Sequence, residues 1–134
     1  MEFCYYDGTY SKSSLTIKKG DQVWLMLDRT RKGKKEFHRG TVDDIMLVKD
    51  NIIIPHYYEF YYFIVNKVQT KNGLLFDFDN PQGADAKRTK VVHKSWYDKN
   101  KHIFPASTWK EFDPEVDYTK QVLRDSAGFV YFQQ

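Results

Sequence analysis

Aromatic and acidic side chains recur close together in this sequence, a combination that suits the binding of a cationic group. Aromatic faces attract an ammonium group through cation–π contact, and a neighbouring carboxylate adds discrimination among methylation states. The residues that offer this chemistry are Tyr61, Phe76, Asp77, Asp79 and Trp96. We predict a ligand-binding site at these positions, with core packing as the alternative role of each aromatic residue.

A second group of candidate binding residues consists of cations close together in the chain. These are Arg29, Arg31, Lys32, Lys34 and Lys35. Clustered cations can neutralise phosphates or meet the acidic face of a partner, whereas a cation-rich loop between strands is also an ordinary solvated surface. We predict that this segment contacts DNA or an acidic protein surface.

Catalytic and metal-binding patterns are absent from the sequence. The four histidines lack the paired spacing of zinc ligands, and Cys4 is the single thiol. The chain has no phosphate-binding loop, nucleophile elbow or dinucleotide fingerprint. Asp43–Asp44 and the pair of Asp77 and Asp79 are the close carboxylates; both could orient a substrate or a general acid, but solvent-facing strand carboxylates are commoner. We therefore expect a protein that is not an enzyme and uses no metal and no cofactor.

The composition indicates one soluble domain that extends over residues 1–134. A chain of 134 residues can bury a single core, and its 17% aromatic content must supply much of that core. The net charge of +3 permits contact with nucleic acid without requiring it. A lone cysteine suits a reducing compartment, and no apolar run approaches the ~20 residues of a membrane span, so no membrane partner is expected.

The sequence predicts that mainly β-strands position the candidate binding residues. The apolar residues of 21–27 alternate, and the aromatic run at 57–65 is rich in residues that favour strands. Asn72 and Gly73 predict a two-residue hairpin turn. The predicted strands are 21–27, 37–48, 52–54, 57–65, 74–78 and 129–132, and residues 1–14 are predicted to be a flexible arm.

These elements together predict an all-β fold. Short strands, regular turn residues and little helix are typical of a small, strongly twisted antiparallel SH3-like barrel. The N- and C-terminal segments would extend from this barrel. In that arrangement the face of the aromatic run that carries Tyr61 is the part available to a ligand.

Three motifs resemble chromatin-associated barrels. Residues 17–24 resemble the opening strand of such barrels, with a Val-Trp ending similar to that of PWWP domains, and residues 75–80 resemble the Tudor motif except that Asp79 replaces glycine. Residues 112–119 and 124–129 are similar to the end of bromo-adjacent homology (BAH) domains. The BAH resemblance extends over most of the chain, although the tryptophan, phenylalanine and arginine-proline motif of that family is missing.

The resemblance implies a nuclear, non-catalytic module that recognises a histone tail or a nucleosome surface. Its further partners would be DNA and other subunits of a chromatin complex. Two alternatives remain open from the residues. A single-stranded nucleic-acid-binding barrel would stack bases on the same aromatic residues, and a scaffold domain of a larger complex would bury them against another protein.

Overall fold

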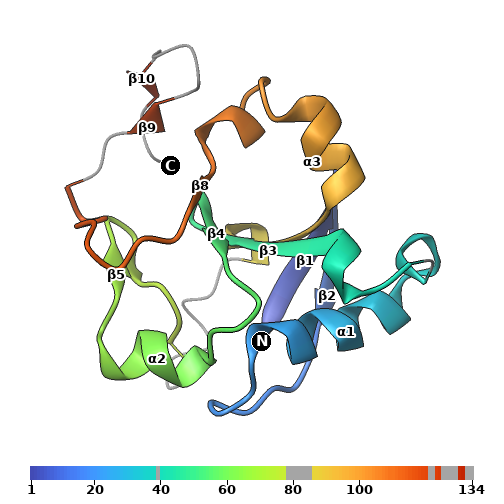
Figure 1. Ribbon diagram of the computed structural model, residues 1–134, viewed down its shortest axis with the longest axis horizontal. Helices are drawn as coiled ribbons and strands as arrows, with labels where there is room; N and C mark the ends of the chain where they lie inside the picture. The colour runs from blue at the N-terminus through green and yellow to red at the C-terminus, as the bar shows by residue number, and fades with distance from the viewer. Residues whose placement is uncertain (39, 78–85, 121–122, 125–129, 132–134) are drawn as a thin grey trace.

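A six-stranded mixed sheet forms the centre of the chain (Figure 1). The computed structural model describes residues 1–38, 40–77, 86–120, 123–124 and 130–131. The strand order is β2-β1-β7-β3-β4-β8, in which β1 runs parallel to β7 and β4 parallel to β8. The strands are β1 (Glu2–Tyr6), β2 (Tyr10–Ser14), β3 (Ile45–Lys49), β4 (Ile52–Ile54), β7 (Thr89–His93) and β8 (Lys110–Glu111).

Helices lie on both faces of this sheet, which gives a three-layer arrangement. The α-helices are α1 (Val23–Gly33), α2 (Phe60–Val65) and α3 (Lys94–Asn100). Short 3-10 turns are η1 (Lys35–Phe37), η2 (Val42–Asp44), η4 (Ala86–Arg88) and η5 (Ala106–Thr108). Two small hairpins complete the description: β5 (Gln69–Thr70) with β6 (Gly73–Leu74), and β9 (Leu123–Arg124) with β10 (Val130–Tyr131). None of the helices in these ranges has the length and apolar character of a membrane span.

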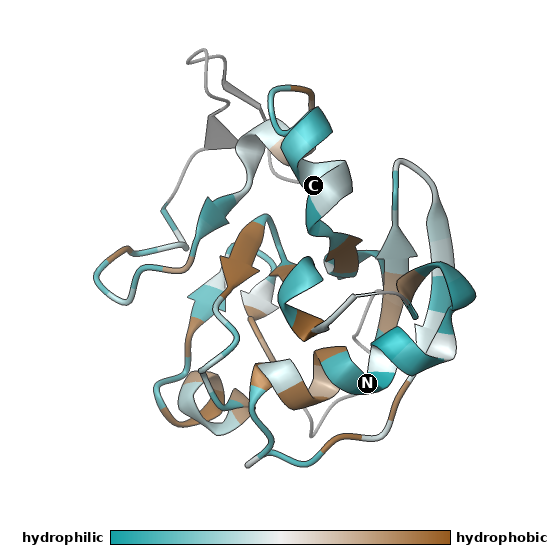
Figure 2. Cartoon of the chain, turned by 45° about the vertical axis from the view of Figure 1, so that its right-hand side comes forward, coloured by the Kyte–Doolittle hydropathy of each residue, from teal (hydrophilic) through white to brown (hydrophobic). Residues whose placement is uncertain are grey.

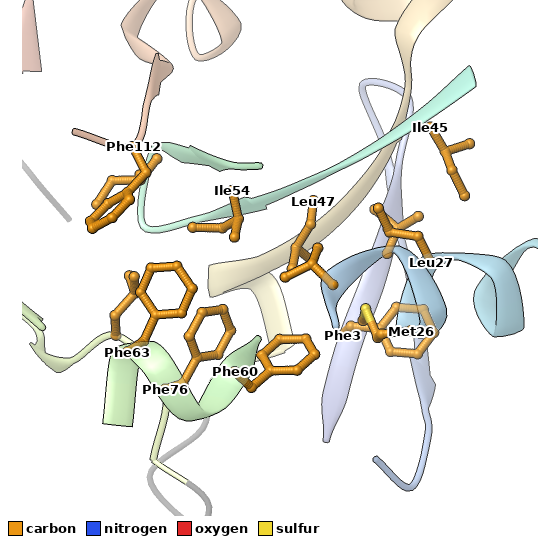
Figure 3. Close-up of a cluster of buried hydrophobic side chains, with 14 of the residues drawn as sticks. Phe3, Met26, Leu27, Ile45, Leu47, Ile54, Phe60, Phe63, Phe76 and Phe112 are labelled. Atoms are coloured by element: carbon orange, nitrogen blue, oxygen red, sulfur yellow. The ribbon is translucent and has the colours of Figure 1, made fainter. Parts of the chain in front are cut away.

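The larger core lies between the sheet and the pair α1 and α2. Alternate residues of the strands point to this face, including Phe3, Leu47 and Ile54. The helices supply Met26 and Leu27 from α1 and phenylalanines from α2, and Figure 3 shows these side chains meeting over the sheet. Figure 2 shows the apolar segments, in brown, gathered here, with hydrophilic residues, in teal, along the second half of α1.

The opposite face of the sheet carries a smaller core that α3 and η5 cover. Tyr6 and Val92 belong to this face, and the rings of Trp96 and Trp109 pack over them. The Tyr6 and Trp96 ring centroids lie 5.2 Å apart in an edge-to-face arrangement. Both faces of the central strands are therefore apolar, as in sheets that are covered on two sides.

The prediction of an all-β SH3-like barrel is wrong. The sheet is open and mixed, and helices form two of the three layers. Residues 21–27, predicted as a strand, begin α1, in which Val23, Met26, Leu27 and Thr30 are buried. This spacing is helical, so one face of α1 packs on the sheet and overrides the local alternation of apolar residues. Residues 1–14, predicted as an arm, form β1 and β2.

The aromatic run is also not a strand. Its second half forms α2, with Phe60 and Phe63 buried three residues apart. Strand propensity depends on packing context. Here the helix is favoured because it places Phe60 and Phe63 together in the core that α1 and the sheet form. The hairpin that follows exists, but Gln69 pairs with Leu74 and Thr70 with Gly73, so the turn falls at 71–72 rather than at the predicted Asn72 and Gly73. The predicted strand 52–54 is confirmed as β4.

A buried ion pair fastens the loop that precedes β7 to the turn of the β3–β4 hairpin. That turn has positive φ at Asp50 (50°) and Asn51 (68°). Arg88 of η4 donates to both carboxylate oxygens of Asp50, at 2.8 and 2.6 Å. Thr70 of β5 also donates to Asp50, at 3.2 Å. One carboxylate thus joins three segments that are distant in sequence.

Candidate functional site

A groove of about 490 Å³ separates the end of α2 from the segment that follows β8. One wall comes from Tyr62 and residues 66–69, and the other from Phe112, Pro114 and residues 116–119. In Figure 1 the orange-red chain after β8 turns beside β5, where this groove lies. The lining residues are Tyr62, Asn66, Lys67, Val68, Gln69, Phe112, Pro114, Val116, Asp117, Tyr118 and Thr119. The groove therefore joins two parts of the chain about fifty positions apart.

Aromatic rings form the base of this groove. Phe112 is buried and lies 5.0 Å from Phe63 and 6.2 Å from the half-buried Tyr62, measured between ring centroids. Tyr118 stacks on the other side of Phe112 at 5.9 Å, with an interplanar angle of 22°. Figure 3 shows Phe112 beside Phe63, so the base of the groove is continuous with the larger core. Rings fixed in this way present a rigid surface to a ligand.

Acidic side chains alternate with apolar ones along the wall after β8. Glu111, Asp113, Glu115 and Asp117 are exposed, whereas Phe112, Val116 and Tyr118 are buried or half-buried. Residues 111–119 contain no Lys, Arg or His. Beyond β8 the backbone forms turns at 114–115 and 118–119, and the four carboxylates face solvent. This wall, residues 111–119, is called the acidic wall below.

Hydrogen bonds from the backbone hold the acidic wall in shape. Asp113 accepts from the N–H of Glu115 at 2.9 Å, and Asp117 accepts from the N–H of Thr119 at 3.0 Å, so each aspartate forms a local Asx-type turn. Hydrogen bonds from the Thr119 hydroxyl and N–H lower the pKa of Asp117, which keeps its carboxylate charged. Burial raises the pKa of Tyr118; the hydrogen bond from the Asp113 N–H opposes this shift, and the Asp113 charge adds to it.

The groove can hold an extended, positively charged chain. Asp117 on its wall attracts Lys or Arg side chains, and tyrosine rings accept their alkyl stems and cationic ends. Lys67 lies on the opposite wall, and Lys120 lies 3.9 Å from Asp117, so a basic ligand would replace Lys120 as the partner of this carboxylate. In the described ranges, no three His, Cys, Asp or Glu residues lie close enough together to hold a metal ion.

The structure does not bring the predicted ligand-binding residues together. Phe76 is buried in the larger core, 5.0 Å from Phe60 between ring centroids (Figure 3). Trp96 lies on α3, across the sheet from Tyr61, which is exposed on α2. Asp77 is exposed directly after Phe76, and Asp79 falls outside the described residues. Because the sheet separates Trp96 from the others, these residues form no common aromatic site.

The predicted basic loop is the second half of α1 and the start of η1. Arg29 donates to the Thr16 carbonyl at 3.1 Å, and Arg31 pairs with Asp28 at 2.9 Å. Lys32 lies 3.8 Å from Asp28, and the Lys34 ammonium lies 5.2 Å from the centre of the Tyr5 ring. Lys35 is exposed. The cations of this segment thus serve largely to join α1 to its surroundings, and none of them faces the groove.

The sequence interpretation missed Tyr62, Asp117 and Tyr118 as site residues. Residues 112–119 were singled out only for their resemblance to BAH domains. The available signal was the alternation of carboxylates with apolar residues over 111–118, without any cation. Tyr62 carried no such signal, because its position depends on α2 being a helix.

Comparison with known proteins identifies the family. The model of the XAP5, circadian clock regulator C-terminal domain matches residues 1–123. The chain belongs to the XAP5 family. Its resemblance to BAH, Tudor and PWWP domains was therefore misleading, because an XAP5 domain with an open mixed sheet shares neither their family nor their barrel.

Curated relatives agree with this XAP5 assignment. The chain is 37% identical to the protein FAM50 homolog of Anopheles gambiae, 36% to that of Drosophila melanogaster and 38% to that of Caenorhabditis elegans. These matches cover 95%, 93% and 88% of the chain and 40%, 39% and 41% of the relatives. The chain thus spans about two fifths of the length of these relatives.

Proposed function

We propose that this XAP5-family chain is a non-catalytic, nuclear interaction module that binds a basic, extended segment of a partner protein. Histone tails are the partner class that this chemistry fits, and the partner would belong to chromatin or to a complex that acts on it. The single observation that supports the proposal is the groove, because Asp117 lines it beside apolar and aromatic side chains, and Glu111, Asp113 and Glu115 are exposed in the same segment of the chain.

The geometry supports binding along the acidic wall rather than in an aromatic cage. A cage for methylated lysine needs several ring faces around one cation. Here Phe112 and Tyr118 are stacked and buried, so they offer a flat base instead. Charge on the partner should therefore matter more than its methylation, and an unmodified basic segment is the expected ligand.

Fluorescence anisotropy with labelled peptides tests the proposal. The probes are an unmodified histone H4 tail peptide, the same peptide trimethylated at one lysine, and a charge-reversed peptide in which glutamate replaces each cation. We expect binding of the first two with similar affinity and no binding of the third. Affinity should fall as salt rises, because exposed charge pairs are screened. Binding of the charge-reversed peptide with equal affinity would refute the proposal.

Asp117→Asn is the matching variant. The asparagine side-chain oxygen can still accept the hydrogen bonds from Thr119, whereas the charge is lost. We expect a several-fold loss of affinity for the H4 peptide. Glu36→Gln removes an exposed charge from η1, outside the groove, and serves as the control. An equal loss of affinity in both variants would assign the effect to net charge rather than to the groove.

Single-stranded nucleic acid is the second candidate ligand, because three large rings are exposed on another surface. Tyr57 is 70% exposed, Tyr61 53% and Trp24 40%. Backbone contacts connect their segments, since the N–H of Trp24 donates to the carbonyl of His56 at 3.1 Å. Exposed rings can stack with bases. A labelled oligothymidine whose affinity falls steeply with salt and is lost in Tyr57→Ala would support this candidate; a flat salt response would exclude it.

A further inference from the structure

The free edge of the central sheet is a second interaction surface, separate from the groove. In the described ranges, β2 pairs with β1 alone and ends the sheet on that side. All five residues of β2 are exposed, and three of them are serine. Natural sheets usually protect such edges with proline, a bulge or several charges. β2 has no proline and one charged residue, Lys12. The ammonium groups of Lys87 and Lys90 lie over the Tyr10 ring at the start of β2, and the serines beside Lys12 leave the backbone there accessible.

The hydrogen-bond phase of the β1–β2 hairpin shows which backbone groups point outward. Met1 and Leu15 exchange two hydrogen bonds, of 2.6 and 2.9 Å. Hydrogen-bonded and non-hydrogen-bonded pairs alternate along an antiparallel ladder. The next pair, Glu2 with Ser14, and the pair Cys4 with Lys12 are therefore of the non-hydrogen-bonded kind. It follows that the N–H and C=O groups of Lys12 and Ser14 point away from β1, toward the open edge.

Charge along this edge favours an acidic partner. Lys12 is exposed on β2 itself, and Lys18 and Lys19 are exposed in the segment that continues from it. Residues 10–20 contain no Asp or Glu, although Glu2 lies across from Ser14 on β1. A second copy of the chain that paired in register at Lys12 would place two ammonium groups opposite each other, which is destabilising.

We propose that an acidic, extended segment of a partner protein adds to β2 as a further strand. The outward N–H and C=O groups of Lys12 and Ser14 would form its ladder, and Lys12 would contact its carboxylates. Main-chain hydrogen bonds supply affinity in strand addition, and side chains supply selectivity. This partner differs in charge from the basic segment proposed for the groove, so one domain would connect two proteins of opposite charge.

The test uses the whole chain and an acidic peptide of alternating glutamate and threonine, with a lysine–threonine peptide as the control. We expect the acidic peptide to shift the NMR amide signals of Lys12 and Ser14 and to slow their hydrogen exchange. The control peptide should leave these amides unchanged. If the two amides already exchange slowly in the free protein at every protein concentration, the edge is covered by the chain itself and the proposal is overturned. If their protection increases with protein concentration, the edge pairs with a second copy of the chain, which also overturns the proposal.

Two variants of Lys12 separate backbone pairing from charge. Lys12→Pro removes an N–H that points away from β1, so no hydrogen bond to β1 is lost. Edge strands tolerate proline at such positions. The substitution should abolish binding of the glutamate–threonine peptide. Lys12→Gln keeps the N–H and should weaken binding several-fold. Unchanged peptide affinity in a Lys12→Pro variant that unfolds like the unmodified chain would overturn the proposal. If the variant does not fold, the test is the NMR measurement on the unmodified chain, where absence of shifts at Lys12 and Ser14 would overturn the proposal.

Discussion

The phenol oxygen of Tyr118 accepts a hydrogen bond of 2.8 Å from the backbone N–H of Asp113. This contact closes the acidic wall into a loop and holds the Tyr118 ring against Phe112. The N–H of Val116 also donates to the Asp113 carbonyl, at 3.2 Å. The shape of the acidic wall therefore depends on a buried phenol.

Tyr118→Phe should loosen the acidic wall. The variant keeps the ring but leaves the Asp113 N–H without its acceptor, which lowers the free energy of unfolding by about 1 kcal/mol. Urea denaturation measures this change, and the same variant should bind the H4 peptide more weakly. Tyr61→Phe, at an exposed position on α2, is the control and should change neither quantity. Equal stability of the two variants would contradict the role assigned to Tyr118.

Loss of either partner of the Asp50–Arg88 pair should destabilise the fold strongly. The Asp50 side chain is 1% exposed, so removing Arg88 leaves a buried charge. Arg88→Met should lower the free energy of unfolding by about 3 kcal/mol. Asparagine at position 50 accepts the positive φ of the turn. Adding Asp50→Asn to Arg88→Met removes the unpaired charge and should restore part of the lost free energy of unfolding. Additive effects of the two substitutions in denaturant unfolding would show that the pair is not coupled.

Phe76 and Tyr61 should respond very differently to truncation, although both were predicted as ligand-binding residues. Phe76 is 2% exposed and Phe76→Ala should lower the free energy of unfolding by about 3–5 kcal/mol. Tyr61 is exposed, and Tyr61→Ala should change this value by no more than about 0.5 kcal/mol. Thermal or chemical denaturation distinguishes the two. Similar costs would mean that α2 does not pack as described.

His56 should make the stability of the fold decrease in mild acid. Burial lowers its pKa, and the Lys94 charge acts in the same direction, while the hydrogen bond to the Ile45 carbonyl and the Asp43 charge oppose the shift. The unfolded chain takes up a proton at this position near pH 6.5, whereas the folded chain takes it up at lower pH. The unfolded state thus binds more protons below about pH 6.5, and stability falls as pH drops through that value.

His56→Gln should reduce this pH dependence. Glutamine retains a donor for the Ile45 carbonyl but does not titrate. The free energy of unfolding, measured from pH 7.5 to pH 5, should fall less in the variant than in the unmodified chain. An equal or steeper fall in the variant would show that burial of His56 is not the source.

The sequence contains a signal for helix α1 that the barrel prediction did not use. Val23, Met26, Leu27 and Thr30 have helical spacing, yet the shorter alternation within 21–27 also fits a strand. Only the packing of α1 on the sheet decides between the two periods. Ile52–Ile54 was recognisable because a turn at Asp50 and Asn51 bounds it on one side and Pro55 on the other.

The candidate site was less accessible from sequence. Trp96 and Phe76 have the right chemistry for a cation site, but the sheet lies between Trp96 and the larger core. Which face an aromatic residue occupies depends on strand order, and β7 lies between β1 and β3 by pairings that no local pattern indicates. The groove likewise combines α2 with residues after β8, so no single motif could reveal it.

NMR mapping of the basic H4 peptide on the unmodified chain tests the central claim most directly. Binding in the groove predicts that the largest amide shifts fall on its two walls, at Asn66, Val68, Asp117 and Thr119. The exposed residues of β2 should not shift. Shifts confined to Trp24, Tyr57 and Tyr61, or no shifts at all, would contradict the assignment of the groove as the site for a basic segment.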